Sequence, residues 1–540
     1  MESPTTRLRL SPSAGSTAGG PDSTSKILFE GITFDDVLLL PRHSTVVPAD
    51  ADTTTQLTPK IKLNIPLLSA PMDTVTEHAL AIALAQEGGL GVIHRNLPIE
   101  EQARAVSKVK RSANGVILDP LTLSPEDTVG KARHLMQRFS ASGFPVTDRG
   151  EPKGKVLGIL TRRDLKFVED ERTAVGGVMT HGNLVTAPPG TTLEEASVIL
   201  NKNKVEKLLI VDKEFRLAGL ITMRDIDRLS QFPRACIDSR GRLRCGAAVG
   251  VDQYERAEAL VAAEADVLVV DTSHGHSENV LRTVREIKKR FGIEVIAGNV
   301  ATADAARALV DAGADAVKAG IGPGSICTTR IVTGVGVPQL TAIMDAVRGA
   351  SGGAGGRGAT VIADGGIRQS GDIAKAIAAG AGAVMMGSMF AGLDESPGEL
   401  VIRQGRRYKS YRGMGSEGAM NAGSADRYGQ KGPMGAGGGS AAVSGSDVQG
   451  DGEARRIKFV PEGVEGLVVF RGSLAEFVYQ MVGGLRASMG YCGCANIATL
   501  QREARFCKVS PATIIENHPH NIRITKESPN YMTEMGSDRE

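Results

Sequence analysis

Short, uninterrupted apolar segments alternate along the chain with longer amphipathic segments. Each apolar segment ends in a small or polar residue, and apolar positions recur every three to four residues in the segments between them. The predicted strands are 66–70, 90–94, 246–250, 267–271, 294–298, 316–320, 360–364 and 383–387. Buried strands each followed by a helix are typical of parallel βα units, and eight such units predict an α/β fold, a (β/α)8 TIM barrel. A doubly wound parallel sheet is the alternative.

The spacing is irregular at one place, because a long segment separates the second predicted strand from the third. Within it, GILTRRD at 158–164 recurs as GLITMRD at 219–225. An internal repeat of this kind indicates two copies of one structural unit, inserted into the barrel. The predicted parts are a barrel over 28–115 and 234–530, a first repeat over 116–175 and a second repeat over 176–233.

Composition narrows the possible partners. The 540 residues carry 63 Lys and Arg against 61 Asp and Glu, a net charge of +2, so no strong field attracts nucleic acid or a membrane surface. A hydrophobic fraction of 41% is sufficient for a packed core. Glycine makes up about 12% of the chain, against a usual 7%, while aromatic residues make up only 4%. Many glycines and few aromatic residues favour α/β packing, with loops whose backbone can approach a phosphate closely.

Cysteine usage and the chain ends bear on the compartment. Six cysteines in 540 residues do not make a disulfide framework, and no apolar run approaches the roughly 20 residues that span a bilayer. Residues 1–27 lack the apolar segment of a secretory signal and are expected to be a disordered tail, and 531–540 are expected to be a C-terminal tail. We expect a soluble cytoplasmic protein with no membrane partner and no specific nucleic acid.

The most informative loop follows the sixth predicted strand and reads GIGPGSICTTR over 320–330. Its glycines let backbone N–H groups approach an anion, and Ser325 adds a hydroxyl donor. Cys327 is expected at the C-terminal ends of the strands, where barrel enzymes carry their reacting groups. Backbone dipoles and Arg330 would favour its thiolate. From the residues alone, Cys327 is either a nucleophile or a buried structural thiol.

The turns after the seventh and eighth predicted strands carry Asp364-Gly365-Gly366 and Gly387-Ser388. In TIM barrels these two turns commonly form a phosphate site. A carboxylate repels phosphate, so Asp364 is expected to accept hydrogen bonds from ribose hydroxyls beside it. Structural turns are the alternative reason for these glycines.

Long ordered motifs resemble the IMP dehydrogenase family. They are GPGSICTTR followed by IVTGVGVPQ, SAPMDTVTE at 69–77, YRGMGS at 411–416, and the paired repeat, which resembles cystathionine-β-synthase (CBS) motifs. The resemblance covers about residues 28–530. It implies NAD-dependent oxidation of IMP to XMP, the committed step toward guanine nucleotides, in a barrel with an inserted tandem CBS domain.

The resemblance also implies the residues that act. Cys327 would add to C2 of the hypoxanthine ring, and water would hydrolyse the resulting thioimidate with the help of Thr329, Arg427 and Tyr428. A mobile flap over 412–460 would carry Arg427 and Tyr428 into the NAD site after NADH leaves. The implied IMP ligands are Met72, Ser325, Asp364, Gly365, Gly366, Met386, Gly387, Ser388, Tyr411, Gly413, Met414, Gly415 and Glu462. The implied NAD ligands are Asp271, Thr272, Ser273, Asn299, Gly320 and Gly322.

Two further sites follow from the same resemblance. A K+ ion would be bound by Gly322, Gly324 and Cys327 of one subunit and by Glu527, Ser528 and Pro529 of a neighbour, in a homotetramer, with pairing into octamers left open. Adenine or guanine nucleotides would bind the CBS pair through Thr161, Arg162, Asp164, Thr222, Arg224 and Asp225.

Two alternative functions compete with this one. GMP reductase shares the barrel, the loop and the cysteine, but its deaminating reduction needs no hydrolytic flap, so Arg427-Tyr428 favours the dehydrogenase. A non-catalytic nucleotide sensor built on the CBS pair is the other alternative, and the intact Cys327 loop disfavours it.

Overall fold

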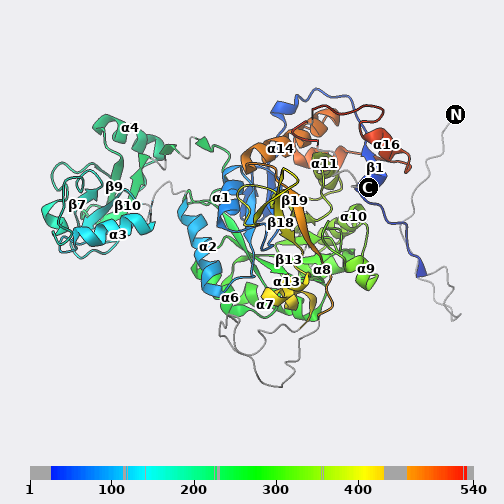
Figure 1. The fold of residues 1–540 in the computed structure, drawn as a ribbon, viewed down its shortest axis with the longest axis horizontal. Helices are drawn as coiled ribbons and strands as arrows, with labels where there is room; N and C mark the ends of the chain where they lie inside the picture. The colour runs from blue at the N-terminus through cyan, green and yellow to red at the C-terminus, as the bar shows by residue number, and fades with distance from the viewer. Residues whose placement is uncertain are drawn as a thin grey trace, which may run out of the picture.

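The structure is a computed structural model, and its central feature is a closed barrel with an insertion on one side (Figure 1). The residues that it describes are 26–112, 117, 120–139, 141–223, 226–227, 231–353, 356, 358–430, 459–526 and 528–531. Several predicted segments therefore lie largely outside the described residues. They are the tails 1–27 and 531–540 and the flap 412–460.

All eight predicted strands form, and they close into one parallel barrel. Its order is β11-β12-β13-β14-β15-β16-β4-β5. The strands are β4 (Leu67–Ser69), β5 (Leu90–Ile93), β11 (Cys245–Val249), β12 (Val267–Asp271), β13 (Glu294–Val300), β14 (Ala316–Ala319), β15 (Thr360–Asp364) and β16 (Ala383–Met386). The predicted TIM barrel is confirmed, and a doubly wound sheet is excluded because β5 pairs with β11 and closes the sheet.

Helices cover the outside of the barrel because each buries one apolar face. In α7 (Glu278–Phe291) the buried residues Val280, Val284 and Ile287 recur at helical spacing, and Gly292 ends the helix with φ +60°. The other outer helices are α1 (His78–Gln86), α2 (Ile99–Ser112), α6 (Tyr254–Ala262), α8 (Ala303–Asp311), α10 (Gln339–Ala350) and α11 (Ser370–Ala378).

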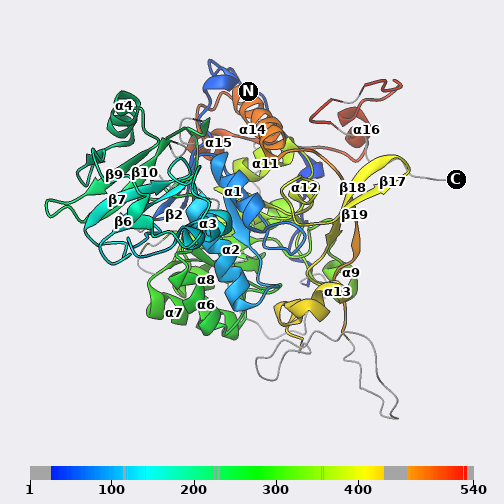
Figure 2. The same ribbon diagram turned by 60° about the vertical axis from the view of Figure 1, so that its left-hand side comes forward.

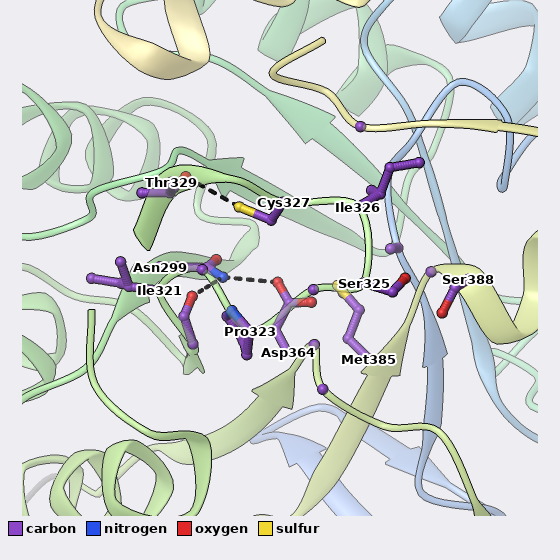
Figure 3. Close-up of a pocket in the computed structure, with 18 of the residues that line it drawn as sticks. Asn299, Ile321, Pro323, Ser325, Ile326, Cys327, Thr329, Asp364, Met385 and Ser388 are labelled. Carbon is purple, nitrogen blue, oxygen red and sulfur yellow. Dashed lines mark hydrogen bonds between the residues drawn. The ribbon is translucent and has the colours of Figure 1, made fainter. Parts of the chain in front are cut away.

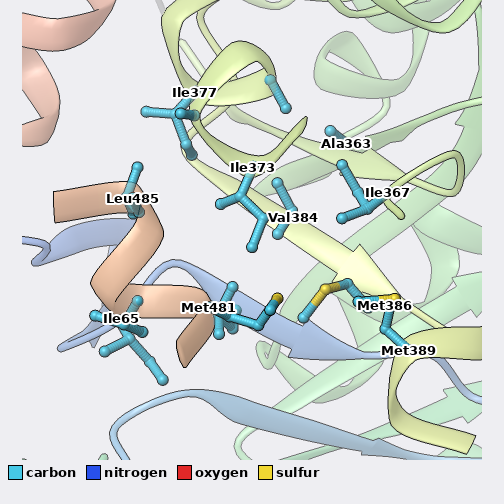
Figure 4. Close-up of a cluster of buried hydrophobic side chains, with 14 of the residues drawn as sticks. Ile65, Ala363, Ile367, Ile373, Ile377, Val384, Met386, Met389, Met481 and Leu485 are labelled. Atoms are coloured by element: carbon cyan, nitrogen blue, oxygen red, sulfur yellow. The ribbon is translucent and has the colours of Figure 1, made fainter. Parts of the chain in front are cut away.

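Consecutive residues of β16 belong to two different cores. Met385 is fully buried inside the barrel with residues of the other strands. Met386 points the other way, into the cluster between the barrel and its helices, which also holds Ile373 of α11 and Met481 of α14 (Leu474–Tyr491) (Figure 4). This alternation follows from the two-residue period of a strand. It decides which side chains of β16 reach the barrel interior.

The inserted segment folds into two similar units beside the barrel (Figure 1). One holds α3 (Val129–Phe139) with the hairpin β6 (Gly143–Thr147) and β7 (Val156–Thr161). The other holds β8 (Thr186–Ala187), α4 (Leu193–Asn203), β9 (Lys207–Val211) and β10 (Leu217–Thr222). Each unit has its own apolar cluster, and a third cluster joins Val156 of one unit to Leu209 and Leu217 of the other.

A three-stranded antiparallel sheet that the sequence pattern did not predict lies beside the barrel (Figure 2). It consists of β17 (Leu400–Arg403), β18 (Arg406–Arg412) and β19 (Glu465–Val469). Residues 413–416 follow β18 and residues 462–464 precede β19, so this sheet brings both segments to the barrel mouth. Within the part of the chain that the structure describes, no helix is long and apolar enough to cross a membrane.

The remaining elements complete the structure around the barrel. They are β1 (Val37–Leu39) paired with β20 (Phe506–Lys508), the hairpin β2 (Thr55–Thr58) and β3 (Ile61–Leu63), and the helices α9 (Thr329–Thr333), α12 (Ser388–Ala391), α13 (Glu417–Ala419), α15 (Ile497–Glu503) and α16 (Thr513–Asn517).

Candidate active site

A cavity of about 360 Å³ lies at the C-terminal ends of the barrel strands (Figure 3). It brings together the residues predicted for catalysis, IMP binding and NAD binding, with the single exception of Thr272. The predicted residues that line it are Met72, Asp271, Ser273, Asn299, Gly320, Gly322, Ser325, Cys327, Thr329, Asp364, Gly365, Gly366, Met386, Gly387, Ser388, Tyr411, Gly413, Met414, Gly415, Arg427, Tyr428 and Glu462.

The loop that carries Cys327 is held by backbone hydrogen bonds on two sides. Within the loop, the N–H of Cys327 donates to the carbonyl of Gly324 at 3.1 Å. Toward the segment before β19, the N–H of Thr328 donates to the carbonyl of Glu462 at 2.9 Å, and the N–H of Val464 donates to the carbonyl of Ile326 at 3.1 Å. The half-buried Cys327 side chain is therefore fixed in place at the cavity wall.

A chain of polar groups begins at the sulfur of Cys327. Its Sγ lies 3.1 Å from Oγ1 of Thr329, and that hydroxyl donates to Oε2 of Glu462 at 2.8 Å. A threonine hydroxyl has one proton, so a thiol at Cys327 donates to Thr329 while Thr329 donates to Glu462. The three groups form a path along which a proton can move from the cavity to a carboxylate.

Gly387 lies at the end of the cavity where β16 passes into α12. A Cβ atom added there would lie 3.0 Å from Oη of Tyr411 and 3.0 Å from Sδ of Met72, so only glycine leaves this space open. Burial raises the pKa of the Tyr411 hydroxyl, which therefore remains a neutral donor. Gly365 and Gly366 have φ of +90° and +80°, the left-handed region that side chains disfavour.

A buried lysine that sequence reasoning did not single out lies beneath the cavity. Lys318 of β14 is fully buried, and its Nζ donates to Asp271 at 2.8 Å and to Asp364 at 2.9 Å. The ammonium of Lys318 therefore links Asp271, which was predicted to bind NAD, to Asp364, which was predicted to bind the ribose. The signal in the sequence was a single lysine within the otherwise apolar strand AVKAG.

Two other lining residues were also missed. Gln339 is buried, and its Nε2 donates to the carbonyls of Ala319 at 3.0 Å and Asp364 at 3.1 Å, which ties two strand ends together. Met385 projects into the barrel and lines the cavity (Figure 3), whereas the predicted Met386 places its side chain in the outer core.

Arg427 reaches residues that were predicted to bind NAD. Its guanidinium forms an ion pair with Asp271, and its carbonyl accepts hydrogen bonds from the N–H and hydroxyl of Ser273 at 3.1 and 3.0 Å. Burial lowers the pKa of Arg427 and raises that of the Tyr428 hydroxyl. Tyr428 stands against Gly415, where an added Cβ would lie 2.7 Å from its ring.

Thr272 is the predicted NAD ligand that does not line the cavity. Its side chain is buried behind the cavity, and its hydroxyl donates to the carbonyl of Gly298 at 2.7 Å, so it supports the neighbouring strand. Asn299 does line the cavity, and its Nδ2 donates to the carbonyl of Gly320 at 2.7 Å and to Asp364 at 3.0 Å. Its buried Oδ1 has no hydrogen-bond partner in the described residues.

The other predicted sites are only partly described. Glu527, Arg224 and Asp225 lie outside the described residues, while Ser528 and Pro529 are exposed. In the first inserted unit, the N–H and the hydroxyl of Thr161 both donate to Asp164 at 2.7 Å, so these two predicted nucleotide ligands lie side by side. Arg162 is exposed nearby, and Thr222 ends β10 at the corresponding place in the second unit.

These features define a class of protein. A parallel eight-stranded barrel, a glycine-lined cavity at its C-terminal mouth and a thiol on the loop after β14 are the features of a TIM-barrel enzyme whose site contains a free cysteine.

Comparison with known proteins identifies the family. A model described as "IMP dehydrogenase / GMP reductase domain" matches residues 31–520. Inosine-5'-monophosphate dehydrogenases of Rhodopirellula baltica and Aquifex aeolicus are 56% and 54% identical to the chain over 94% of its length, and the matches cover 89% and 98% of those proteins. The chain belongs to the IMP dehydrogenase / GMP reductase family.

A solved structure is also similar in sequence and fold. It is a GMP reductase variant from Trypanosoma brucei in complex with guanosine 5'-monophosphate. The two chains superpose with a TM-score of 0.80 at 39% identity, and the match covers 93% of this chain and 100% of the other.

Proposed function

We propose that this chain oxidises IMP to XMP with NAD, the step that commits IMP to guanine nucleotides. One IMP, one NAD⁺ and one water give XMP, NADH and a proton. The observation that carries this proposal is the presence of Cys327 and the Arg427-Tyr428 pair in one cavity. The thiol of Cys327 serves the oxidation. Arg427 and Tyr428 serve a hydrolysis that a reductase would not need.

IMP binds with its phosphate toward β16 and its ribose toward β15. The phosphate occupies the space above Gly387 and Ser388, where Tyr411 and Ser325 supply hydroxyl donors. Asp364, held by Lys318 and Asn299, accepts hydrogen bonds from the ribose hydroxyls. The purine then lies toward Met414 and Glu462, with C2 beside Cys327. The positive-φ glycines 365 and 366 permit this close approach.

The oxidation begins at the sulfur. The Cys327 thiolate forms a bond to C2, and the ring nitrogen takes the electron pair, which makes C2 tetrahedral. Hydride then leaves C2 and the C–N double bond re-forms, giving a thioimidate on Cys327. Bound NAD supplies the hydride acceptor. A soft, polarisable nucleophile suits a reaction in which it must first add and later leave.

Hydrolysis releases the product and restores the thiol. Water adds to C2 of the thioimidate, the C2–S bond breaks, and the sulfur leaves with its electron pair, giving XMP. Thr329, whose proton is donated to Glu462, has an oxygen free to accept a hydrogen bond from the water and so orient it. Arg427 and Tyr428 stand at the same cavity and position that water. Arg427 is the general base in the role implied by the resemblance, and burial lowers its pKa in the direction this role requires.

NAD shares its binding residues with Arg427. Ser273, Asn299, Gly320 and Gly322 line the cavity, and the unpartnered Oδ1 of Asn299 is an acceptor that fits the carboxamide N–H of a nicotinamide. Asp271 pairs with Arg427 in this structure, so Arg427 must withdraw before NAD takes its place. We propose that residues 412–460 form the flap that makes this exchange.

A K+ ion is proposed at the carbonyls of Gly322, Gly324 and Cys327. Neutral backbone carbonyls suit an alkali cation, and the loop that presents them is held in a turn by the Cys327-to-Gly324 hydrogen bond. The ion would stiffen the loop. The site would be completed by a neighbouring subunit, through Glu527, Ser528 and Pro529. A site shared in this way entails a homotetramer. Octamers form if two tetramers pair.

The inserted units are proposed to be CBS motifs that bind adenine or guanine nucleotides and regulate the barrel. Under this proposal the chain divides into a barrel (28–115 and 234–530) and two CBS repeats (116–175 and 176–233). The ligands are Thr161, Arg162 and Asp164 in one repeat and Thr222, Arg224 and Asp225 in the other. A thermal-shift titration with ATP, GDP and GTP tests this, because stabilisation by a nucleotide must disappear when residues 116–233 are deleted.

A cytoplasmic location is also proposed. All six cysteines are free thiols, as expected in a reducing compartment. Fractionation of cells expressing the untagged chain tests this proposal, and recovery of the protein in a membrane or organelle fraction would contradict it.

One experiment separates the dehydrogenase from its relative. The family model covers both activities, so purified protein is given IMP with NAD in one reaction and GMP with NADPH in another. We expect XMP and NADH only from the first. Mass spectrometry of quenched reactions should find the nucleotide on the peptide that contains Cys327. Turnover confined to GMP and NADPH would establish a reductase, and no turnover with either pair would favour a nucleotide sensor.

A further inference from the structure

The residue before Arg427 forms an ion pair of its own. The carboxylate of Asp426 accepts a hydrogen bond from Arg95, Nη1 to Oδ2 at 2.9 Å, and its Oδ1 lies 2.7 Å from Nη2 of the same guanidinium. Gln253 adds a second hydrogen bond, from its Nε2 to Oδ2 at 3.2 Å. Arg95 follows β5 and Gln253 precedes α6, so both partners belong to the rigid barrel.

This pair is asymmetric in its burial. The side chain of Arg95 is 5% exposed, whereas that of Asp426 is 41% exposed. Among the described residues, Asp426 is the only hydrogen-bond acceptor of the Arg95 side chain, so removing Asp426 leaves a buried cation without its counter-charge. The charge of Arg95 also contributes to the lowered pKa values of Arg256 and Arg427, although burial is the larger cause for both. This corner of the barrel mouth therefore requires the carboxylate.

Asp426 and Arg427 contact the barrel at two separate places. Asp426 is bound by Arg95 beyond β5, and Arg427 is bound by Asp271 at the end of β12. Two ion pairs on adjacent residues fix both the position and the rotation of a short segment. The segment here is 425–428, a single turn of 3-10 helix.

We infer that Arg95 is a positioning residue for Arg427. By binding Asp426, it holds the segment where Arg427 occupies Asp271 and Ser273 and where Arg427 and Tyr428 reach the thioimidate. This inference rests on the proposed dehydrogenase function. Because NAD needs the same residues, Arg95 favours the hydrolytic arrangement over the NAD-bound one.

Gly250 offers a way to disturb the contact without removing a charge. It follows β11, and an added Cβ would lie 2.9 Å from Oδ2 of Asp426 and 3.0 Å from the amide of Gln253. Its backbone is not in the left-handed region, so Gly250→Ala is tolerated by the barrel. The new methyl group would displace Asp426 and leave Arg95 intact.

The experiment measures hydride transfer and hydrolysis separately. Rapid mixing of enzyme, IMP and NAD gives the rate of the first NADH formed, and steady-state turnover reports the slow hydrolysis. We expect Arg95→Met, Asp426→Asn and Gly250→Ala to leave the NADH burst rate within about twofold of the unsubstituted enzyme. Turnover should fall about tenfold or more, and KM for NAD should decrease, because the competing segment is released. Arg95→Lys, which keeps the charge but not the fork, should recover part of the turnover.

The control is Asp252→Asn, which removes an exposed carboxylate that pairs with Arg282 at 2.7 Å in the same loop region. It should change neither rate. If Arg95→Met fails to fold, Asp426→Asn and Gly250→Ala still decide the matter, since both leave the buried side chains of the barrel unchanged. Equal slowing of both steps, or unchanged turnover in Asp426→Asn, overturns the inference. Failure of the unsubstituted enzyme to make XMP overturns the proposed function instead, so the two failures are distinguishable.

Discussion

The buried ammonium of Lys318 lies 2.9 Å from the carboxylate of Asp364, the residue proposed to bind the ribose of IMP. The same ammonium lies 2.8 Å from Asp271, which pairs with Arg427. The substrate side and the cofactor side of the cavity therefore share one positive charge. Its removal would leave two carboxylates facing each other across the barrel interior.

Lys318→Met is expected to weaken IMP binding and to destabilise the barrel. Without the ammonium, Asp364 loses the partner that orients it, so KM for IMP should rise at least tenfold. Breaking a buried ion pair by removing one partner costs about 3–5 kcal/mol, which urea denaturation should detect. The control is Lys288→Met, which breaks a 2.7 Å pair with Asp315 outside the barrel and should leave KM unchanged. An unaltered KM in Lys318→Met would contradict the proposed role of Asp364.

Alkylation should distinguish Cys327 from the buried thiols. Burial raises the pKa of Cys236 to about 12 and raises that of Cys245, Cys492 and Cys494 as well, so at pH 8 these thiols are protonated and unreactive. Iodoacetamide at pH 8 should therefore modify Cys327 and the half-buried Cys507 first, and saturating IMP should protect Cys327 alone. Peptide mapping measures both. Labelling of Cys327 that IMP leaves unchanged would place the substrate elsewhere.

Cys327→Ala is expected to abolish turnover while IMP binding remains measurable by calorimetry. The phosphate and ribose contacts do not involve the sulfur, so the loss should fall on the chemical step. Cys507→Ala removes a free thiol outside the cavity and should retain full activity. Any XMP formation by Cys327→Ala at the rate of the unsubstituted enzyme would rule out covalent catalysis.

Gly387→Ala should raise KM for IMP at least tenfold with a smaller change in kcat. The added methyl would stand 3.0 Å from Tyr411 and Met72, in the space proposed for the phosphate, while the backbone at Gly387 has negative φ and accepts alanine. Gly371→Ala in α11, where nothing lies within 4 Å of the new Cβ, is the matched control. Steady-state kinetics compares the two. An equal effect in both variants would indicate a general loss of folding.

Arg427→Ala is expected to slow hydrolysis more than hydride transfer, by tenfold or more in steady state. A burst of NADH should then precede slow turnover, because the thioimidate forms normally and accumulates. Arg285→Ala breaks an exposed pair with Glu278 and should show neither change. If the burst and the steady state slow by the same factor, Arg427 has no separate part in the hydrolysis.

The barrel could be predicted from the sequence because its strands are apolar throughout. Buried on both faces, segments such as VLVVD show no alternation and no competing pattern. The antiparallel sheet of β17, β18 and β19 was not predicted, since RRYKSYR is largely polar and gives no strand period. Its pairing with β19 depends on contacts across the long segment between them.

The site was predictable where chemistry is carried by one loop, and not where it depends on distant partners. Cys327 and its glycines lie together in the sequence. The pairs Arg95–Asp426 and Lys318–Asp271 join residues far apart along the chain, and no local pattern specifies them. The strand end at β12 exposes alternate residues: Asp271 and Ser273 face the cavity, and the side chain of Thr272 between them turns away.

The insertion interrupts the chain but not the hydrogen bonding of the barrel. Strands β5 and β11, which flank it, are immediate neighbours, with Gly91 opposite Cys245 and Ile93 opposite Ala247. The inserted segment therefore leaves the barrel after one strand and re-enters it at the neighbouring strand. We therefore expect a short linker in place of the inserted segment to preserve the closed sheet, so that the barrel can be studied or crystallised by itself.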